Sequence, residues 1–335
     1  MDVNKYTVGW ICALPLEMAA AIAMLDEDHG RPSHQAATDH NTYRLGQIGD
    51  HDVVLGCLPS GVYGMTRAVS VAVQMLASFP SIRIGLLVGI GGGAPSPEID
   101  IRLGDVVISK PSSNSGGVIQ HDMGRLIAGD FLAKGQLNKP PQVLLTAIAN
   151  LEADHMLGDN RICEILAEVV ANKKQKKGQK PFYRSPGLEN DLLFQSDYIH
   201  TGALNGSCAS CDPTRLVNRP PRDTGEDPQI HYGVISSANH IMQDGKMRDW
   251  LHRETGVICF ETEAAGLMDV FPCLVIRGIC DYADSHKNKL WQRYAAMRAA
   301  ACAKELLLDA VRSQSNHHRC HIIADRQMGK CRPTD

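Results

Sequence analysis

Runs of apolar residues alternate with amphipathic runs along most of this chain of 335 residues. Short runs that are apolar almost throughout are typical of buried strands, whereas apolar residues that recur every three or four positions are typical of helices. Strands are therefore predicted at residues 6–14, 42–48, 52–58, 82–90, 105–109, 117–121, 231–237, 257–260 and 273–279. Helices are predicted at residues 15–25, 65–79, 142–157, 159–172, 244–254, 263–270 and 290–313.

The order of these elements predicts the class of fold. The strands at 42–48 and 52–58 flank Gly49-Asp50, a pair typical of a tight turn, and we expect them to form a hairpin. Elsewhere strands and helices alternate, which favours a buried sheet with helices on both faces. We therefore expect an α/β fold, a three-layer α/β/α sandwich.

A change of composition divides this pattern. Residues 173–230 contain a cluster of lysines, several prolines and a Cys208-x-x-Cys211 pair, which indicates an irregular insertion inside one domain spanning residues 1–313. Residues 314–335 are polar and aperiodic, so we expect a disordered tail. The cysteine pair could be half of a zinc site, but no second pair follows at a suitable spacing, and a structural or incidental pair is favoured.

Composition and charge exclude several classes of function. Hydrophobic residues make up 44% of the chain, enough for a substantial core, and the net charge of −3 gives no electrostatic reason to expect nucleic acid or membrane partners. Aromatic residues, at 5%, are too scarce for a base-stacking surface. No apolar run approaches the ~20 residues that cross a bilayer. The N-terminus lacks the features of a signal peptide, so we expect a cytoplasmic protein whose cysteines are mostly small buried apolar residues.

Two acidic clusters beside predicted buried strands are the strongest signs of chemistry. A carboxylate beside a buried strand loses hydration, which is costly unless the group is used. Glu261 and Glu263 are separated by one residue, so in an extended segment both point to one side and could accept hydrogen bonds from neighbouring hydroxyls. They could equally cap the next helix. Asp281 follows the predicted strand at 273–279, where ligands of open α/β sheets bind, whereas Asp284 is expected to cap the next segment.

Two further features are ambiguous on their own. Gly89-x-Gly91-Gly92-Gly93 ends a predicted strand, so it is either a tight turn or a loop whose N–H groups approach a ligand. Its spacing is neither the dinucleotide fingerprint nor a P-loop. Glu17 lies in the first turn of the helix at 15–25, where an acid favours the helix dipole while facing water, or else serves the same site.

Four motifs in order resemble one family. They are A-L-P-L-E at 13–17, V-G-I-G-G-G at 88–93, F-E-T-E-A-A at 260–265 and R-G-I-C-D-Y-A-D at 277–284. Together they are similar to the nucleoside phosphorylase/nucleosidase superfamily of the purine and uridine phosphorylase type, and most to its fungal branch, which is often attached to ankyrin repeats or NTPase modules. The resemblance covers residues 6 to about 308. It implies a central mixed sheet.

The resemblance also implies roles for the acids. Glu17 matches the glutamate that activates water in the methylthioadenosine/S-adenosylhomocysteine nucleosidases. Glu263 matches the acid that binds the ribose hydroxyls, with Glu261 beside it. Asp281 matches the aspartate that protonates purine N7.

Other positions complete the implied site. Ile90 and Gly91 match the border of the sugar site, and the base pocket matches Asn239, His240, Ile241 and Met242. The chain departs from the family at Thr262, where methionine is usual, and at Cys280, where a serine usually supports the aspartate.

The expected reaction is therefore hydrolysis of the N-glycosidic bond of an adenosine-like purine ribonucleoside or nucleotide, with water as co-substrate and no cofactor or metal. A phosphorylase is the first alternative, but its phosphate cradle follows the first strand, where the Glu17 carboxylate would repel phosphate. An inactive nucleoside-sensing or self-association module is the second.

For a nucleotide substrate the candidate phosphate ligands are Arg67, Arg102, Arg219 and Arg222, although the last two are expected to face solvent. The resemblance also implies a homo-oligomer.

Overall fold

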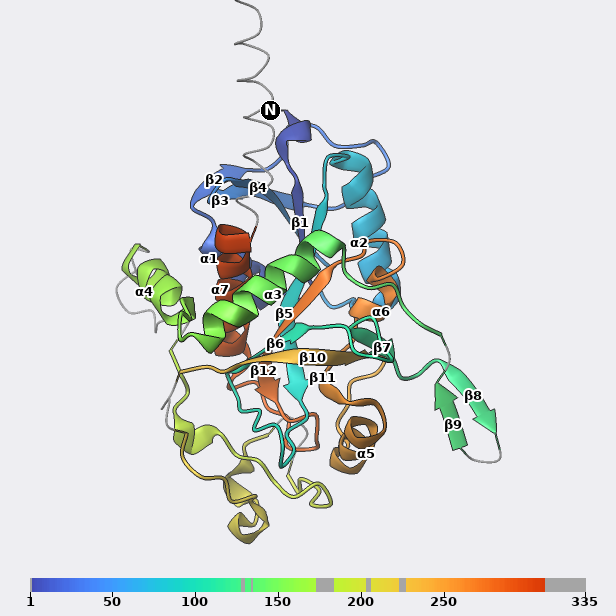
Figure 1. The fold of residues 1–335 in the computed structure, drawn as a ribbon, viewed down its shortest axis with the longest axis vertical. Helices are drawn as coiled ribbons and strands as arrows, with labels where there is room; N and C mark the ends of the chain where they lie inside the picture. Colours follow the sequence, from blue (N-terminus) through green and yellow to red (C-terminus); the bar gives the residue numbers. More distant parts are fainter. Residues whose placement is uncertain are drawn as a thin grey trace, which may run out of the picture.

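A mixed β-sheet runs through the centre of the molecule (Figure 1). The computed structural model describes residues 2–127, 130–133, 135–172, 184–202, 206–222 and 227–310. The order of the main sheet is β11-β10-β6-β12-β5-β1-β4-β3-β2, with β7 paired to β10. Its strands are β1 (Val8–Cys12), β2 (Glu27–Gly30), β3 (Tyr43–Ile48), β4 (His51–Cys57), β5 (Ile84–Gly93), β6 (Val106–Ser109), β7 (Val118–Gln120), β10 (Ile230–Ser237), β11 (Val257–Glu261) and β12 (Leu274–Asp281).

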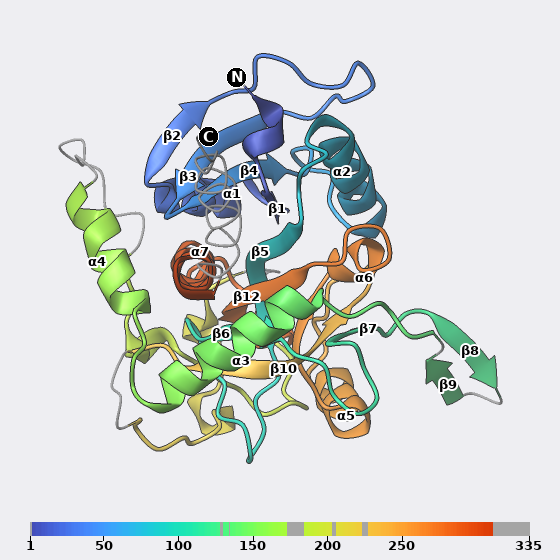
Figure 2. The same cartoon turned by 45° about the horizontal axis from the view of Figure 1, so that its top comes forward.

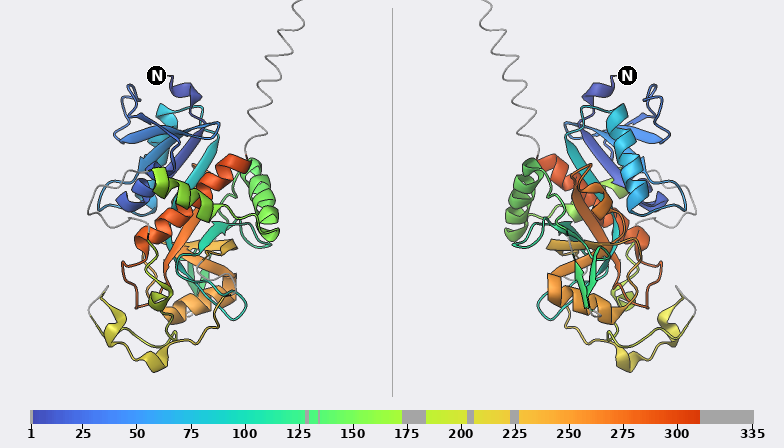
Figure 3. Two further views of the ribbon diagram at one scale, coloured as in Figure 1. Left: turned by 90° about the vertical axis from the view of Figure 1, so that its left-hand side faces the viewer. Right: turned by 90° about the vertical axis from the view of Figure 1, so that its right-hand side faces the viewer.

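Helices cover both faces of this sheet (Figure 3). They are α1 (Pro15–Met24), α2 (Met65–Ser78), α3 (Gln142–Met156), α4 (Ile162–Asn172), α5 (Gly245–Thr255), α6 (Ala264–Leu267) and α7 (Gln292–Ala310). Helices α1, α3 and α4 pack on α7, whereas α2 packs on α6 at the other side of the sheet. Short 3-10 helices are η1 (Val3–Lys5), η2 (Leu188–Asn190), η3 (Cys208–Ser210) and η4 (Pro213–Arg215).

Side-chain alternation along the strands builds two cores. In β1, Val8 and Trp10 pack with Ala300 of α7, whereas Ile11 points to the opposite core with Ala72 of α2. All of these side chains are fully buried. Burial of a large apolar side chain contributes about 1.5–3 kcal/mol each, and here it requires a helical layer on each face. The prediction of a three-layer α/β fold with a central mixed sheet is therefore confirmed.

Strand β5 departs from its prediction in a way that positions the site. The glycine stretch at 89–93 was predicted to be a turn or loop, but β5 continues through it to Gly93. Gly92 and Gly93 pair with Phe260 and Cys259 of β11 in antiparallel fashion, so the pairings among β5, β12, β6, β10 and β11 close on themselves. This closure brings the ends of β5, β11 and β12 together.

Other differences concern short or polar elements. Strand β2, and the hairpin of β8 (Gly124–Ile127) and β9 (Asp130–Ala133), were not predicted. The sequence of β2, Glu-Asp-His-Gly, is polar because this strand is at the sheet edge, and the β8–β9 hairpin projects from the body (Figure 2). The helix predicted at 263–270 is only the short α6. Residues 173–183 and the expected tail lie outside the described residues. No helix in the described ranges is long and apolar enough to cross a membrane.

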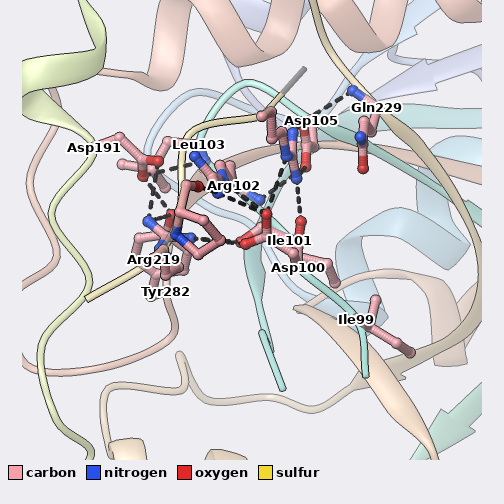
Figure 4. A network of polar contacts seen from close by, with 12 residues as sticks. Ile99, Asp100, Ile101, Arg102, Leu103, Asp105, Asp191, Arg219, Gln229 and Tyr282 are labelled. Atoms are coloured by element: carbon pink, nitrogen blue, oxygen red, sulfur yellow. Dashed lines mark hydrogen bonds and ion pairs between the residues drawn. The ribbon is translucent and has the colours of Figure 1, made fainter. Parts of the chain in front are cut away.

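Arginines anchor the segment at 184–222 to the sheet (Figure 4). Arg219 Nη2 lies 3.0 Å from Asp191 and donates to Tyr282 Oη at 2.8 Å. Arg222 Nη2 lies 2.7 Å from a carboxylate oxygen of Asp105, just before β6. The expectation that both arginines face solvent is wrong, because ion pairs with buried aspartates bring them inside. Because these ion pairs occupy the two guanidinium groups, neither arginine is placed to bind a phosphate.

Candidate functional site

A cavity of about 440 Å³ lies at the ends of β1, β5, β11 and β12. Its volume is within the range of small-molecule sites. Ten of the predicted site residues line it: Glu17, Ile90, Gly91, His240, Ile241, Met242, Glu261, Thr262, Glu263 and Asp281. Asn239 does not line it, and its backbone N–H donates to Asp122 instead. The fold therefore unites acids from both ends of the chain.

The Glu17 carboxylate is fixed by backbone groups. Pro15 begins α1, and Glu17 in its first turn folds back so that Oε2 accepts from the N–H groups of Ala13 and Leu14, both at 2.8 Å. Its Oε1 accepts from Ile90 N–H of β5, also at 2.8 Å. The side chain is 3% exposed, so it is not the solvent-facing helix acid of the simpler interpretation. Burial raises the pKa of Glu17 against the opposing effects of Arg277 and these backbone donors.

Arg277 is at the centre of the acidic side of the cavity. Its guanidinium is fully buried in β12, where Nη2 donates to Glu261 and lies 3.4 Å from Glu263 Oε2. Glu261 also accepts from the backbone N–H groups of Glu263 and Ala264 at the start of α6. Glu261 therefore caps the helix and pairs with Arg277, as the capping interpretation expected, and Glu263 remains the less satisfied acid.

The carboxyl group of Glu263 is buried and has a raised pKa. Burial, and then the neighbouring Glu261, raise its pKa to about 7, although Arg277 and the Thr262 hydroxyl act in the opposite direction. Thr262 Oγ1 donates to Glu263 Oε1 at 2.5 Å. A buried carboxylate that lines a cavity with few donors is suited to accept hydrogen bonds from ligand hydroxyls.

Two glycines of β5 make room for these groups. A Cβ atom on Gly89 would clash with Glu17 Oε1 and lie 2.5 Å from Arg277 Nη1. A Cβ atom on Gly92 would lie 2.7 Å from Asp281 Oδ1. The glycine run therefore serves as a strand without side chains, on which the acids pack.

Asp281 ends β12 and is paired with a cation. Its Oδ2 lies 2.7 Å from Lys287 Nζ and accepts from the Cys280 thiol at 3.1 Å, while Oδ1 accepts from Ala283 N–H at 3.0 Å. Ala283 has a positive φ of 51°, a conformation that side chains disfavour and that often marks a functional turn. Burial lowers the pKa of Lys287, but the adjacent Asp281 outweighs it and the net shift is upward.

Two histidines also line the cavity. His121 Nδ1 lies 2.7 Å from Ser236 Oγ and its Nε2 lies 3.3 Å from His240 Nε2, with the two rings edge to face. Burial, and then His240, lower the pKa of His121 to about 4, so this imidazole is neutral at physiological pH. The two imidazole rings, Phe260 and Met242 together make a surface suited to a flat heteroaromatic base.

Three residues of the site were missed from the sequence. Arg277 carried a signal, because a charged side chain interrupts an apolar strand run. His121 ends the strand predicted at 117–121, a position that favours ligand contact. Lys287 is in an irregular stretch six residues beyond Asp281, and no pattern there indicates its direction.

Comparisons with known proteins show what the chain is similar to in sequence. No protein-family model matches the chain. It is 49% identical over 304 residues to a nucleotide-binding leucine-rich repeat (NLR)-like protein of Hyaloscypha variabilis, covering 91% of this chain but only 29% of that protein. It is 25% identical over 306 residues to the 5'-methylthioadenosine/S-adenosylhomocysteine nucleosidase of Mycobacterium bovis, covering 90% of this chain and 95% of that enzyme.

Solved structures share the fold. The corresponding nucleosidase of Helicobacter pylori superposes with a TM-score of 0.56 at 13% identity, covering 91% of this chain and 98% of that one. A variant of that enzyme, solved with 5'-methylthioadenosine in its active site, has a TM-score of 0.54, again at 13% identity, covering 90% and 98% of the two chains.

Proposed function

Because the chain has the fold of the nucleoside phosphorylases and methylthioadenosine/S-adenosylhomocysteine nucleosidases, we propose that it hydrolyses the N-glycosidic bond of a purine ribonucleoside or nucleotide. The products are the free base and the sugar. This proposal assigns water as the nucleophile and an adenosine-like compound as the substrate. The chain spans 29% of its NLR-like relative, and the proposal concerns this domain alone.

The sugar end of the cavity supports ribose binding. Glu263 is 3% exposed and lines the cavity. Its Oε2 lies 3.4 Å from Arg277 Nη2, so the ion pair leaves this oxygen able to accept a further hydrogen bond. Ribose hydroxyls would donate to this carboxylate. Cleavage of an N-glycosidic bond passes through an oxocarbenium-like sugar, and the carboxyl groups of Glu17, Glu261 and Glu263 around one guanidinium favour that developing positive charge.

The proton for the leaving base comes from the Asp281–Lys287 pair. As the bond from the sugar C1′ to N9 breaks, its electrons move into the purine ring and N7 becomes basic. Asp281, protonated in the reacting complex, delivers this proton to N7, and Lys287, whose Nζ is 2.7 Å away, then pairs with the carboxylate that remains. Water attacks C1′ and gives its proton to Glu17. General acid and general base steps of this kind typically contribute ~10²–10⁴-fold each.

The observation that carries hydrolysis over phosphorolysis is the fixed position of Glu17. Three backbone N–H groups that could cradle an anion at the end of β1 and on β5 already bind its carboxylate. The guanidinium of Arg277 is likewise engaged by Glu261 and Glu263. A phosphate ion would therefore meet a carboxylate instead of free donors.

The test is product analysis by chromatography for a panel that includes adenosine, 5'-methylthioadenosine and ATP, with and without inorganic phosphate. We expect free base without phosphate and no sugar 1-phosphate when phosphate is added. Base release that requires phosphate and yields a sugar 1-phosphate would establish the phosphorylase instead. Preference for ATP would involve the exposed Lys289 at the cavity, because Arg102, Arg219 and Arg222 are paired with aspartates.

A second candidate is a nucleoside-binding sensor without turnover. The observation that favours it is the ion pair of Asp281 with Lys287, which stabilises the deprotonated acid, together with the likeness to an NLR-like protein. Asp281→Asn separates the two candidates. A hydrolase loses base release in this variant, whereas a sensor releases no base in either form and still binds purine nucleoside in a calorimetric titration.

A further inference from the structure

Three metal-ligating side chains of the 184–222 segment lie together outside the cavity. The ligand atoms of His200, Cys208 and Cys211 are all within 4.8 Å of one another. We propose that these residues bind a zinc ion that orders this segment where it contacts the loop following Asp281. The sequence had favoured a structural or incidental Cys208-x-x-Cys211 pair, because no second pair follows at a suitable spacing. His200 was not recognised as a partner, because it is a single histidine outside any paired motif.

The donor set suits Zn²⁺. Two thiolates and an imidazole are soft to borderline ligands, and Zn²⁺ takes them in tetrahedral sites with one further ligand. Cys208 and Cys211 have no disulfide, and η3 between them begins at Cys208, so a short turn brings both thiols to one side.

The His200 ring supplies a second, independent observation. Its Nδ1 accepts from Gly202 N–H at 3.1 Å, so the neutral ring has its proton on Nε2, and that buried nitrogen has no hydrogen-bond partner. Leaving a buried donor unsatisfied costs about 1–3 kcal/mol. Zinc on Nε2, with the proton moved to Nδ1, removes this cost. The Gly202 amide then turns to water, because Gly202 is exposed.

The cluster joins two parts of the chain. His200 N–H donates to Ser285 Oγ at 2.9 Å, and the Cys208 thiol lies 3.9 Å from the carbonyl oxygen of His286. The His286 ring contacts the His200 ring edge to face at 5.4 Å between centroids, and both of its nitrogens are buried without hydrogen-bond partners. A water molecule would complete the tetrahedron, because the ring nitrogens of His286 are not among the ligand atoms that lie within 4.8 Å of one another. A cavity of about 480 Å³, lined by Cys208 and His286, gives the ion a path from solvent.

The proposed zinc site is close to a loop that carries a residue of the candidate active site, although the metal takes no part in the reaction. Lys287 directly follows His286 and pairs with Asp281. Zinc at His200, Cys208 and Cys211 would order the loop that presents Lys287.

The experiment measures zinc in the full chain purified under reducing conditions without chelator. We expect about one Zn²⁺ per chain by elemental mass spectrometry, and a lower melting temperature after treatment with EDTA. The variants Cys208→Ser, Cys211→Ser and His200→Ala should each lose at least ~100-fold in zinc affinity. Cys163→Ser removes an exposed thiol of α4 outside the cluster and should keep the wild-type zinc content.

A second measurement does not depend on the stability of the variants. The metal-free wild-type chain is titrated with Co²⁺, and tetrahedral thiolate ligation should produce visible d–d bands and a sulfur-to-cobalt charge-transfer band that Cys163→Ser retains. Zinc content in the wild type no higher than in Cys208→Ser, with no cobalt bands, would overturn the proposal. So would a Cys208–Cys211 disulfide whose reduction leads to no metal uptake.

Discussion

Two clusters of arginines and carboxylates, one buried and one partly buried, differ in their charge balance. The pocket cluster comprises Glu17, Glu261, Glu263 and Arg277, so three carboxyl groups surround one guanidinium. The framework cluster of Figure 4 comprises Asp100, Asp105, Asp191, Arg102, Arg219 and Arg222, in which each aspartate pairs with at least one arginine. His231 adds a further contact to Asp105 at 2.9 Å.

The balance decides the protonation of the buried acids. Burial opposes the ionisation of Asp105, but Arg222 and His231 together hold its pKa below the usual value. Burial and Glu261 raise the pKa of Glu263 to about 7, because Arg277 is shared among several acids. A balanced cluster stabilises the fold, whereas an unbalanced one retains a carboxylate for a ligand. The comparison therefore predicts different results for matched substitutions.

The largest expected effect is on the activity of a pocket-cluster variant. Glu17→Gln keeps the size of the side chain but removes the base, so kcat for base release should fall ~10²–10⁴-fold. The matched control is Glu164→Gln, another first-turn helix acid, which is exposed on α4 and should leave kcat unchanged. Steady-state kinetics on the best substrate of the panel measure both. Wild-type activity in Glu17→Gln would remove Glu17 from the mechanism.

The framework cluster should respond with a loss of stability. Arg222→Met leaves Asp105 buried without its arginine, and breaking a buried pair in this way should lower the free energy of unfolding by about 3–5 kcal/mol. Urea denaturation followed by circular dichroism measures the loss. Arg44→Met is the control, because its partner Asp28 is exposed and Arg44 itself is only half-buried, and it should cost at most about 1 kcal/mol. Equal losses in both variants would contradict a structural role for the framework cluster.

Ionisation of Glu263 in the pocket cluster should lower the free energy of unfolding at high pH. Its pKa rises from 4.5 in the unfolded chain to about 7 in the folded chain, so the folded state binds more protons between these values. Stability from this group is therefore present at low pH and lost as pH rises through about 7, by up to ~3 kcal/mol. Glu263→Gln does not titrate, so relative to wild type it should gain stability from pH 5 to pH 8.

Urea denaturation at several pH values in this window tests that gain. The exposed Glu98→Gln is the control for the change of glutamate to glutamine. A difference between Glu263→Gln and wild type that stays constant with pH would show that Glu263 is ionised throughout, as in a balanced cluster. The same variant should bind ribose hydroxyls less well, because an amide is the poorer acceptor.

The sequence allowed the acids of the pocket cluster and the neighbouring Asp281 to be predicted, because each lies at the end of a strand or shortly after it. Glu17, Glu263 and Asp281 were each selected from motif and position, and the structure brings them to one cavity. The glycine run was misinterpreted because a strand of glycines has no side-chain pattern. Its reason lies in packing, since the space above Gly89 and Gly92 is filled by Glu17 and Asp281, from distant parts of the chain.

The framework cluster and the zinc ligands could not be predicted in the same way. Arg219 and Arg222 are in a proline-rich loop, where no periodicity indicates the direction of a side chain. Their partners Asp191 and Asp105 are 28 and 117 residues away in the sequence, respectively. His200 and Cys208 likewise do not belong to one helix or strand, so no sequence period predicts that their side chains lie together. Partners of loop residues depend on the tertiary fold, whereas those of strand ends follow from topology.

The smallest effect should come from Thr262, which offsets part of the imbalance of the pocket cluster. Its hydroxyl donates to Glu263 Oε1 at 2.5 Å and lowers the pKa of that carboxyl group. Thr262→Val keeps the shape and removes the donor, so the acid limb of kcat/KM should move to higher pH by up to ~1 unit, because ionised Glu263 loses a hydrogen bond. Thr146→Val, on the exposed side of α3, should leave the pH profile unchanged. A shift to lower pH, or none, would mean that the Thr262 hydroxyl does not stabilise ionised Glu263.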